Sequence, residues 1–202
     1  MTRILKPLTL AFMLLFLGAC SNTKIIEAVG NEQEVANECR NQNFNVELDC
    51  YDLIAHKNSF AQLRLGINAK YNGNFVEAIN RYEIAKKQKN FYANALIADL
   101  YINGFGVEMD ENKAISLLKD TRKLDPIAAY KLSQFYLRDG DISDAIELLE
   151  FAGENGVKDA QNQLQILYSN SQYIDPDFEK TTYWQSKFNE NNKDFIKEIY
   201  GR

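Results

Sequence analysis

Small residues recur at fixed distances along this chain, and their spacing restricts the possible folds more than any other feature. One set lies in the middle of successive predicted helices: Gly66, Ala98, Ser133 and, imperfectly, Gln165. The second set lies in the helix after each of these: Ala78, Ala114, Ala145 and, less well matched, Thr181. The first set precedes the second by 12, 16, 12 and 16 residues, and the return distances are 20, 19 and 20. A repeat of this period predicts a solenoid of stacked helical pairs.

The physical reason for the spacing is close helix packing. A small side chain lets two antiparallel helices approach to the nearer end of the usual range of about 8–10 Å between axes. In the first unit, larger side chains are expected to fill the space on either side: Leu65, Phe75, Ile79 and Tyr82. Glycines stand where a helix must end and can adopt a left-handed cap: Gly73, Gly104 and Gly140. Each pair leaves an apolar stripe exposed, so the pairs must stack.

The motifs around these positions resemble two related repeat families. Units one and three resemble tetratricopeptide (TPR) repeats. The matching residues of unit one are Leu65-Gly66, Gly73, Glu77-Ala78-Ile79, Tyr82 and Ala85, and those of unit three are Gly140-Asp141, Asp144-Ala145-Ile146, Leu149 and Ala152. The stretch 98–107, with Asp110 and Lys113-Ala114, is similar to the Sel1-like variant with its longer Gly-x-Gly-Val loop, and unit four is a degraded Sel1-like copy with Trp184 in its core. The resemblance covers residues 59–190. It implies an all-α fold, a right-handed α-solenoid of about four TPR/Sel1-like helix-turn-helix repeats.

Two further helical segments flank the repeats. Residues 31–58 are expected to form an N-terminal helical hairpin, whose second helix, Val46 to Lys57, carries one apolar face: Val46, Cys50, Leu53 and Ile54. Residues 191–202 are expected to form a C-terminal capping helix that covers the last repeat. Its apolar side consists of Phe195, Ile196, Ile199 and Tyr200.

The N-terminus has the features of a secretion signal. Arg3 and Lys6 precede an apolar run, Leu8 to Leu17, which is shorter than the roughly 20 residues that span a bilayer. The run ends in Leu17-Gly18-Ala19-Cys20, which resembles a bacterial lipobox. The resemblance implies that residues 1–19 are a cleaved signal peptide, that Cys20 is acylated, and that residues 20–30 are a lipid-anchored tether. An ordinary signal peptide with a chance cysteine is the alternative.

The residue after Cys20 is Ser21 and not aspartate. By resemblance to Gram-negative lipoproteins, we expect the periplasmic face of the outer membrane. Cys39 and Cys50 are then the only thiols left, in an oxidising compartment, so a disulfide between them is the simplest interpretation. A redox-active pair is disfavoured, because the spacing does not resemble C-x-x-C.

Composition and motifs argue against several classes of function. Loss of Arg3 and Lys6 with the signal peptide changes the formal charge from −5 to −7, and no basic stripe suggests nucleic-acid binding. His56 is the only histidine, and the aspartates lie at turns and helix starts, where they cap exposed N–H groups. We therefore expect no catalytic residue, no metal site, no cofactor and no small-molecule substrate.

The remaining candidate is a binding surface. The first helices of stacked pairs line the concave side, and their side chains outside the packing positions form the candidate groove: Lys70, Tyr71, Tyr92, Asp99, Asn103, Tyr130, Gln134, Arg138, Asn162 and Asn170. Tyrosines and amides suit an extended peptide. Lys70 and Arg138 are the sharper predictions, because they are positive on an otherwise acidic protein.

Three functions are compatible with this sequence. The first is an adaptor whose groove binds another envelope protein or a peptide segment, as similar repeat lipoproteins do in secretion, pilus or exopolysaccharide-export machines. The second is a regulator of a periplasmic enzyme such as a cell-wall hydrolase. The third is an enzyme with two carboxylates converging in a cleft, for which the sequence gives no sign.

Overall fold

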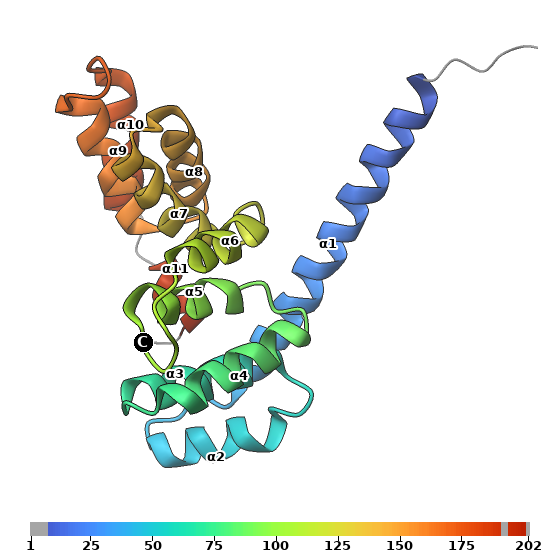
Figure 1. The fold of residues 1–202 in the computed structure, drawn as a ribbon. Coiled ribbons are helices and arrows are strands. Elements are labelled where there is room, and N and C mark those ends of the chain that lie inside the picture. The colour runs from blue at the N-terminus through green and yellow to red at the C-terminus, as the bar shows by residue number, and fades with distance from the viewer. Residues whose placement is uncertain (1–7, 191–193, 201–202) are drawn as a thin grey trace, which may run out of the picture.

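The computed structural model describes the backbone of residues 8–190 and 194–200, and the side chains from residue 22 onward within those ranges. All regular elements in this part of the chain are helices (Figure 1). They are α1 (Leu8–Glu38), α2 (Phe44–Ile54), α3 (Ser59–Tyr71), α4 (Phe75–Lys87), α5 (Ala93–Asn103), α6 (Glu111–Thr121), α7 (Pro126–Asp139), α8 (Ile142–Glu154), α9 (Lys158–Asn170), α10 (Phe178–Glu190) and α11 (Phe195–Tyr200).

Four helical pairs form the body of the molecule: α3 with α4, α5 with α6, α7 with α8, and α9 with α10. Successive pairs also pack on one another, from α4 on α5 to α8 on α9. Figure 1 shows the resulting curved stack, with α1 projecting from its first half. The predicted all-α solenoid of helical repeats is therefore confirmed.

The small residues lie at the points of closest helix approach. A Cβ atom added to Gly66 would lie 2.5 Å from Cε1 of Tyr82, so only glycine fits between α3 and α4. The equivalent residues of the next two pairs are fully buried: Ala98, Ser133, Ala114 and Ala145. In the fourth pair Trp184 fills the core instead, next to Gly153, and is 3% exposed.

The N-terminal helices differ from a simple hairpin. Both α1 and α2 pack against α3, and a disulfide between Cys39 and Cys50 joins them, with 5.5 Å between the two Cα atoms. The prediction of which face of α2 is buried is wrong in part, because α3 packs against the side of α2 that carries Tyr51. Tyr51 is therefore buried, whereas Leu53 is 75% exposed.

Residues 20–30, the segment predicted to be the tether, lie within the continuous helix α1. The side chains of Cys20 and of the predicted signal peptide, residues 1–19, lie outside those that the structure describes, and so does the backbone of residues 1–7. Among the residues that the structure describes, no helix is long and apolar enough to cross a membrane.

The C-terminal helix α11 folds back toward the first repeats. It contacts α3, and Phe195 packs on Tyr92 with 6.2 Å between ring centroids. Phe195 and Ile196 touch both halves of the hydrophobic core, the one built on the early helices and the one around Trp184. The prediction that this helix covers the last repeat is wrong in part, because its apolar side also packs against the early helices.

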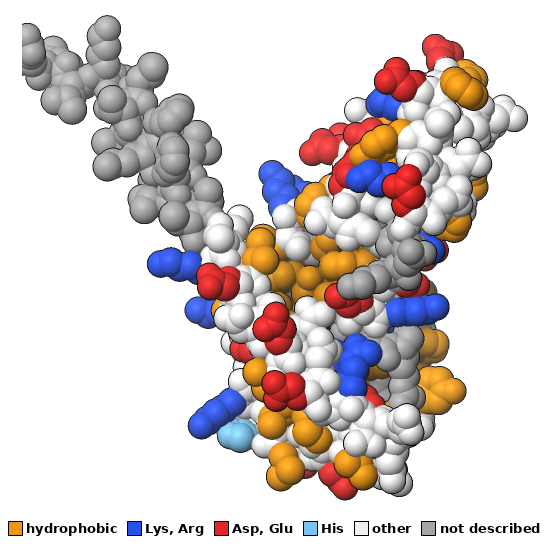
Figure 2. All heavy atoms as spheres, turned by 180° about the vertical axis from the view of Figure 1, so that it is seen from behind, with side chains coloured by type: hydrophobic (Ala, Val, Ile, Leu, Met, Phe, Trp, Pro, Cys, Tyr) orange, Lys and Arg blue, Asp and Glu red, His pale blue; other side chains and the backbone are white. Residues whose placement is uncertain are grey.

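The surface seen from behind combines an apolar recess with mixed charge. Figure 2 shows hydrophobic side chains gathered between the base of α1 and the later repeats. Elsewhere on this face, basic and acidic side chains are interspersed.

Candidate binding groove

Polar side chains connect the first helices of successive pairs. The carboxylate of Asp99 on α5 lies between Lys70 on α3, which donates to it directly, and Lys131 on α7, at 3.0 Å. Further along, the amide of Gln134 on α7 donates to that of Gln163 on α9 at 2.8 Å. These contacts show that the first helices share one face, as the groove prediction requires.

Asp99 is the centre of this row of contacts. Burial would raise the pKa of its carboxyl group, but Lys131 and Lys70 together hold it below its usual value. Asp99 is therefore ionised at neutral pH and neutralised by the two lysines. It holds α3, α5 and α7 together and is not available as a general acid.

A cavity of about 600 Å³ opens beside Lys70. Most of its walls are apolar, and its lining residues are Phe44, Glu47, Leu48, Tyr51, Arg64, Ile67, Asn68, Lys70, Tyr71, Phe75, Phe105 and Tyr200. They come from α2, α3, the start of α4, the loop after α5, and α11. Tyr71 is 82% exposed, so it belongs to the rim.

The Gly-x-Gly-Val loop after α5 builds one wall of this cavity. Phe105 stacks on Phe75 with 4.6 Å between ring centroids. The next residue, Gly106, has a positive φ of 72°, and a Cβ atom there would lie 2.7 Å from Cβ of Phe75. Only glycine therefore lets the loop lie this close to α4. The long loop that distinguishes the Sel1-like unit thus has a structural role at the cavity.

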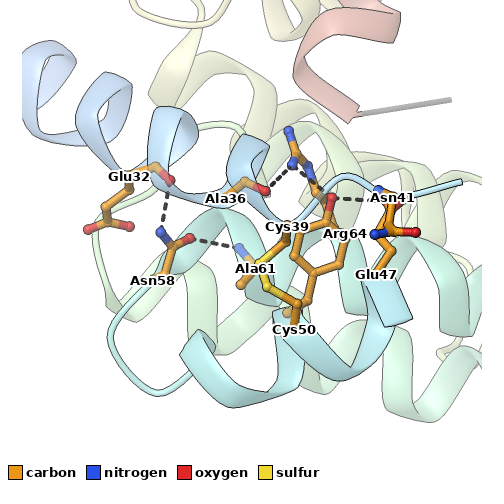
Figure 3. The surroundings of a disulfide bond; sticks show 10 residues. Glu32, Ala36, Cys39, Asn41, Glu47, Cys50, Asn58, Ala61 and Arg64 are labelled. Carbon is orange, nitrogen blue, oxygen red and sulfur yellow. Dashed lines mark hydrogen bonds between the residues drawn. A yellow bond between two sulfur atoms is a disulfide. The ribbon is translucent and has the colours of Figure 1, made fainter. Parts of the chain in front are cut away.

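The opposite wall is fixed by Arg64, which sequence reasoning did not identify. Its guanidinium donates to the carbonyl of Ala36 at 2.9 Å (Figure 3). It also donates to the hydroxyl of Tyr51 at 2.9 Å and to the side chain of Asn37. Burial lowers the pKa of Arg64, and the hydroxyl of Tyr51 partly compensates. Because it binds the C-terminal end of α1, Arg64 anchors that helix beside the disulfide.

Contacts from α1 to the start of α3 complete this junction. The side chain of Asn58 donates to the carbonyl of Glu32 at 2.8 Å, and it also caps α3 by accepting from the backbone of Ala61 (Figure 3). The carboxylate of Glu32 accepts from the backbone and the hydroxyl of Ser59. The cavity therefore lies next to a rigid junction.

The ten predicted groove residues have different environments. Lys70 and Tyr71 line the cavity, whereas Tyr92 is 8% exposed and is covered by Phe195 and Tyr200 of α11. Asp99 and Gln134 belong to the row of contacts between helices. The members outside the cavity and the seat of α11 are exposed or partly exposed: Asn103, Tyr130, Arg138, Asn162 and Asn170. The structure therefore brings only the first part of the set together at one cavity.

The two cations singled out from the sequence are both paired. Lys70 binds Asp99, and Arg138 binds Glu111 through two contacts of 2.8 Å and Asp139 at 2.9 Å. Glu111 and Asp139 hold the pKa of Arg138 above its usual value. Neighbouring carboxylates therefore neutralise both cations in this structure, and their role in binding stays a prediction.

Asp125 is a second residue that the sequence did not single out. It begins α7 by accepting from the backbone of Ile127 at 2.8 Å, and its side chain is completely buried. Burial raises its pKa to about 7, although hydrogen bonds from the backbone of Ile127 and Ala128 oppose the shift. With no exposed surface, this carboxyl group cannot reach a substrate in this structure. The described residues contain no group of three or more His, Cys, Asp or Glu side chains that could hold a metal ion.

Comparison with known proteins supports the fold. No protein-family model and no curated protein sequence matches this chain. A Sel1 repeat protein from Oxalobacter formigenes is similar in structure, with a TM-score of 0.66 and 21% identity over 84% of this chain and 75% of that one. A Pseudomonas aeruginosa protein is similar with a TM-score of 0.60 and 14% identity over 90% and 77%.

A protective antigen of uropathogenic Escherichia coli that displays an SLR fold is also similar, with a TM-score of 0.57 and 18% identity. The match covers 82% of this chain but only 39% of the antigen. At these identities the likenesses define the fold, a Sel1-type helical-repeat solenoid, and leave the function to be argued from the surface.

Proposed function

We propose that this protein is a lipid-anchored adaptor that binds another envelope protein through the cavity at the first repeat. The observation that carries the proposal is the cavity itself, because it is open, mostly apolar and lined by aromatic side chains from five separate segments. Such a site accommodates apolar side chains of a partner segment.

The polar groups at the cavity support a peptide partner over a small apolar ligand. Asn68 and Glu47 line the wall, and Tyr71 stands at the rim, so backbone amides of a bound segment find donors and acceptors there. Aromatic residues at a rim are also common anchors of protein interfaces. Catalysis is disfavoured, because Asp99 is paired with two lysines and Asp125 is closed off.

The proposed location is the periplasmic face of the outer membrane of a Gram-negative bacterium, with Cys20 as the acylated residue. The lipobox-like sequence supports this, and the oxidising compartment fits the disulfide between Cys39 and Cys50. We further propose that the partner belongs to an envelope machine for secretion, pilus assembly or exopolysaccharide export.

Site-specific crosslinking in cells tests the binding site. A photoreactive amino acid replaces Tyr71 at the cavity rim, and in a matched control it replaces Phe178, an equally exposed aromatic residue on α10 that is 87% exposed. We expect a discrete crosslinked partner from position 71 and none from position 178. Equal crosslinking at both positions, or none at position 71, would refute the cavity as the binding site.

The anchor has its own test, which does not depend on the cavity. Replacement Cys20→Ala should move the protein from the membrane fraction to the soluble periplasmic fraction, because stable anchoring needs the acyl chains. Labelling with a radioactive fatty acid should be lost at the same time. Persistence of Cys20→Ala in the membrane fraction would show that another segment holds the protein there.

A further inference from the structure

One cation in the wall of the cavity has no acidic partner. Arg64 is 6% exposed and lines the cavity. The groups that accept from it are all neutral: the carbonyl of Ala36, the hydroxyl of Tyr51 and the side chain of Asn37. Among the residues that the structure describes, no carboxylate forms an ion pair with it. Buried charges in proteins are paired as a rule, so Arg64 lacks a usual partner.

The guanidinium of Arg64 also has unused donors. A guanidinium carries five N–H donors, and the three hydrogen bonds of Arg64 all leave from Nη1 and Nη2. Its Nε is buried and has no partner within the described part of the chain. Buried polar atoms in native proteins are nearly always hydrogen-bonded. The missing partner is an acceptor, and the planar fork of an arginine suits a carboxylate best.

Glu47 lines the same cavity, but both of its oxygens are already bound. Its Oε1 accepts from the hydroxyl of Tyr51 at 3.0 Å, and its Oε2 accepts from the backbone N–H of Asn41 at 3.2 Å. The hydroxyl of Tyr51 in turn accepts from Arg64. Glu47 therefore reaches Arg64 through this hydroxyl and not by a direct ion pair, which leaves Nε for a group that enters the cavity.

The cavity wall carries net positive charge on an acidic protein. Arg64 and Lys70 contribute two positive charges and Glu47 one negative charge, which leaves +1, whereas the whole chain has a formal charge of −5. Lys70 also shares the carboxylate of Asp99 with Lys131, so two ammonium groups divide one negative charge. Between mostly apolar walls, opposite charges attract more strongly than in water. The cavity therefore complements an anionic group that has apolar neighbours.

The face of α3 connects the rim of the cavity to Arg64. Arg64, Asn68 and Tyr71 follow one another at spacings of four and three residues and all line the cavity, so they share one face of the helix. Tyr71 is 82% exposed, whereas Arg64 is buried. The two residues are about 10 Å apart along the axis, and Asn68 is one turn from Arg64. A backbone that lies beside Asn68 and Tyr71 can therefore send a side chain to Arg64.

We propose that the cavity recognises a glutamate side chain of the partner segment, whose carboxylate accepts from Nε of Arg64. This inference rests on the proposed adaptor function and identifies the chemistry of the partner. Apolar residues on either side of the glutamate pack on the aromatic wall formed by Phe75 and Phe105. A side chain is favoured over a chain end, because the backbone finds its polar partners nearer the rim, at Asn68 and Tyr71, than Arg64 lies.

A competition between peptide libraries tests this proposal on the full-length protein. The first library is acetyl-X-X-Glu-X-X-amide, in which X is Leu, Ile, Phe or Tyr, and the second has Gln in place of Glu. Both ends are blocked, so the central glutamate supplies the one carboxylate of each peptide. Mass spectrometry counts the peptides that the immobilised protein retains. We expect at least tenfold more Glu than Gln peptide, and equal retention or retention of neither would overturn the proposal.

Two matched variants locate the selectivity. Arg64→Gln should abolish the preference for Glu, whereas Arg138→Gln should keep it, because Arg138 lies outside the cavity and is paired with Glu111 and Asp139. Arg64 also holds the end of α1, so a measurement on the wild type accompanies the variant. In an NMR titration with a retained Glu peptide, the Nε–H resonance of Arg64 should shift and that of Arg138 should not. An unchanged Arg64 resonance would contradict the assignment.

Two further probes distinguish other sources of a carboxylate. One is the Gln library with a free C-terminal carboxylate, and the other is laurate as a competitor. Retention of the free-ended Gln peptides at the level of the Glu peptides would show that the cavity binds a chain end. Displacement of the Glu peptides by laurate at a concentration below theirs would show that it binds a lipid. Either result overturns the assignment to glutamate.

The crosslinking at Tyr71 keeps this inference separate from the proposed function. A partner captured at position 71 without any preference for Glu peptides refutes the carboxylate anchor and leaves the adaptor function standing. Failure to capture a partner at position 71 refutes the cavity as the adaptor site, whatever the libraries show.

Discussion

Asp125→Asn should stabilise the protein more at pH 8 than at pH 5. The folded chain raises the pKa of this carboxyl group from 3.8 to about 7 through burial. A group with a higher pKa in the folded than in the unfolded state holds its proton more tightly when folded. Its contribution to stability is therefore fully present below pH 3.8 and is lost as the pH rises through about 7.

The size of the effect follows from the shift. At 1.36 kcal/mol for each pKa unit, a shift of about three units corresponds to about 4 kcal/mol of lost stability above pH 7. Relaxation around the ionised group reduces this figure, so we expect a gain of about 2 kcal/mol for Asp125→Asn at pH 8. Asparagine keeps the oxygen that accepts from the backbone of Ile127, and it is an equally good N-cap residue.

Urea unfolding followed by circular dichroism at both pH values measures the difference, with the disulfide kept oxidised. Asp110→Asn is the matched control, because Asp110 caps α6 by accepting from the backbone of Lys113 at 2.9 Å but is exposed. Its effect should be the same at pH 5 and pH 8. A difference for Asp125→Asn that does not change with pH would show that the folded chain does not raise the pKa of this carboxyl group.

Three other changes test the packing of the N-terminal half. Gly66→Ala should destabilise the protein by about 1–3 kcal/mol in urea unfolding, because its Cβ would meet the ring of Tyr82, whereas Gly30→Ala, with no atom within 4 Å, should be neutral or stabilising. Replacing Cys39 and Cys50 by serine should lower the free energy of unfolding by about 2–3 kcal/mol, and an unchanged value would show that the junction holds without the disulfide. Arg64→Leu should increase hydrogen exchange at the C-terminal end of α1 at least tenfold and leave α7–α10 unchanged, and equal effects in both regions would contradict a local role.

The repeat spacing predicted the solenoid because two helices can cross closely only where the residues at the crossing are small. Gly66 and Ala78 must be small wherever two helices cross closely, so their periodicity is visible without any knowledge of the remaining chain. The same logic explains the weakest unit. In the fourth pair, Gln165 and Thr181 are larger than the equivalent residues of the other pairs. Trp184 of α10 fills the core there and lies next to Gly153 of α8.

The location of α11 could not be predicted in the same way. Sequence identifies which side of a short helix is apolar, but any exposed apolar surface of suitable shape can receive that side. The burial of Asp125 has a similar origin. Its role as the first residue of α7 is local and readable from the Asp-Pro pair, whereas its pKa depends on how the surrounding chain encloses it.

The groove residues show why composition is a poor guide to free charge. Lys70 and Arg138 are cations on an acidic protein, and an excess of carboxylates makes it more probable that each cation finds a partner within the same molecule. At Lys70 and Arg138 neighbouring carboxylates therefore neutralise the positive charge. What remains for recognition is the apolar cavity, and its aromatic walls come from segments that are far apart in the sequence.

The continuity of α1 links the proposed anchor to the proposed binding site. With Cys20 as the acylated residue, the helix from there to Val29, its first residue that is buried in the core, separates the body from the anchor by about 14 Å, at about 1.5 Å for each residue. The disulfide, Arg64 and the contacts of Glu32 fix its far end beside the cavity (Figure 3). A stiff connection of this kind presents the cavity at a set distance and orientation, which lowers the entropy lost when a membrane-bound partner docks.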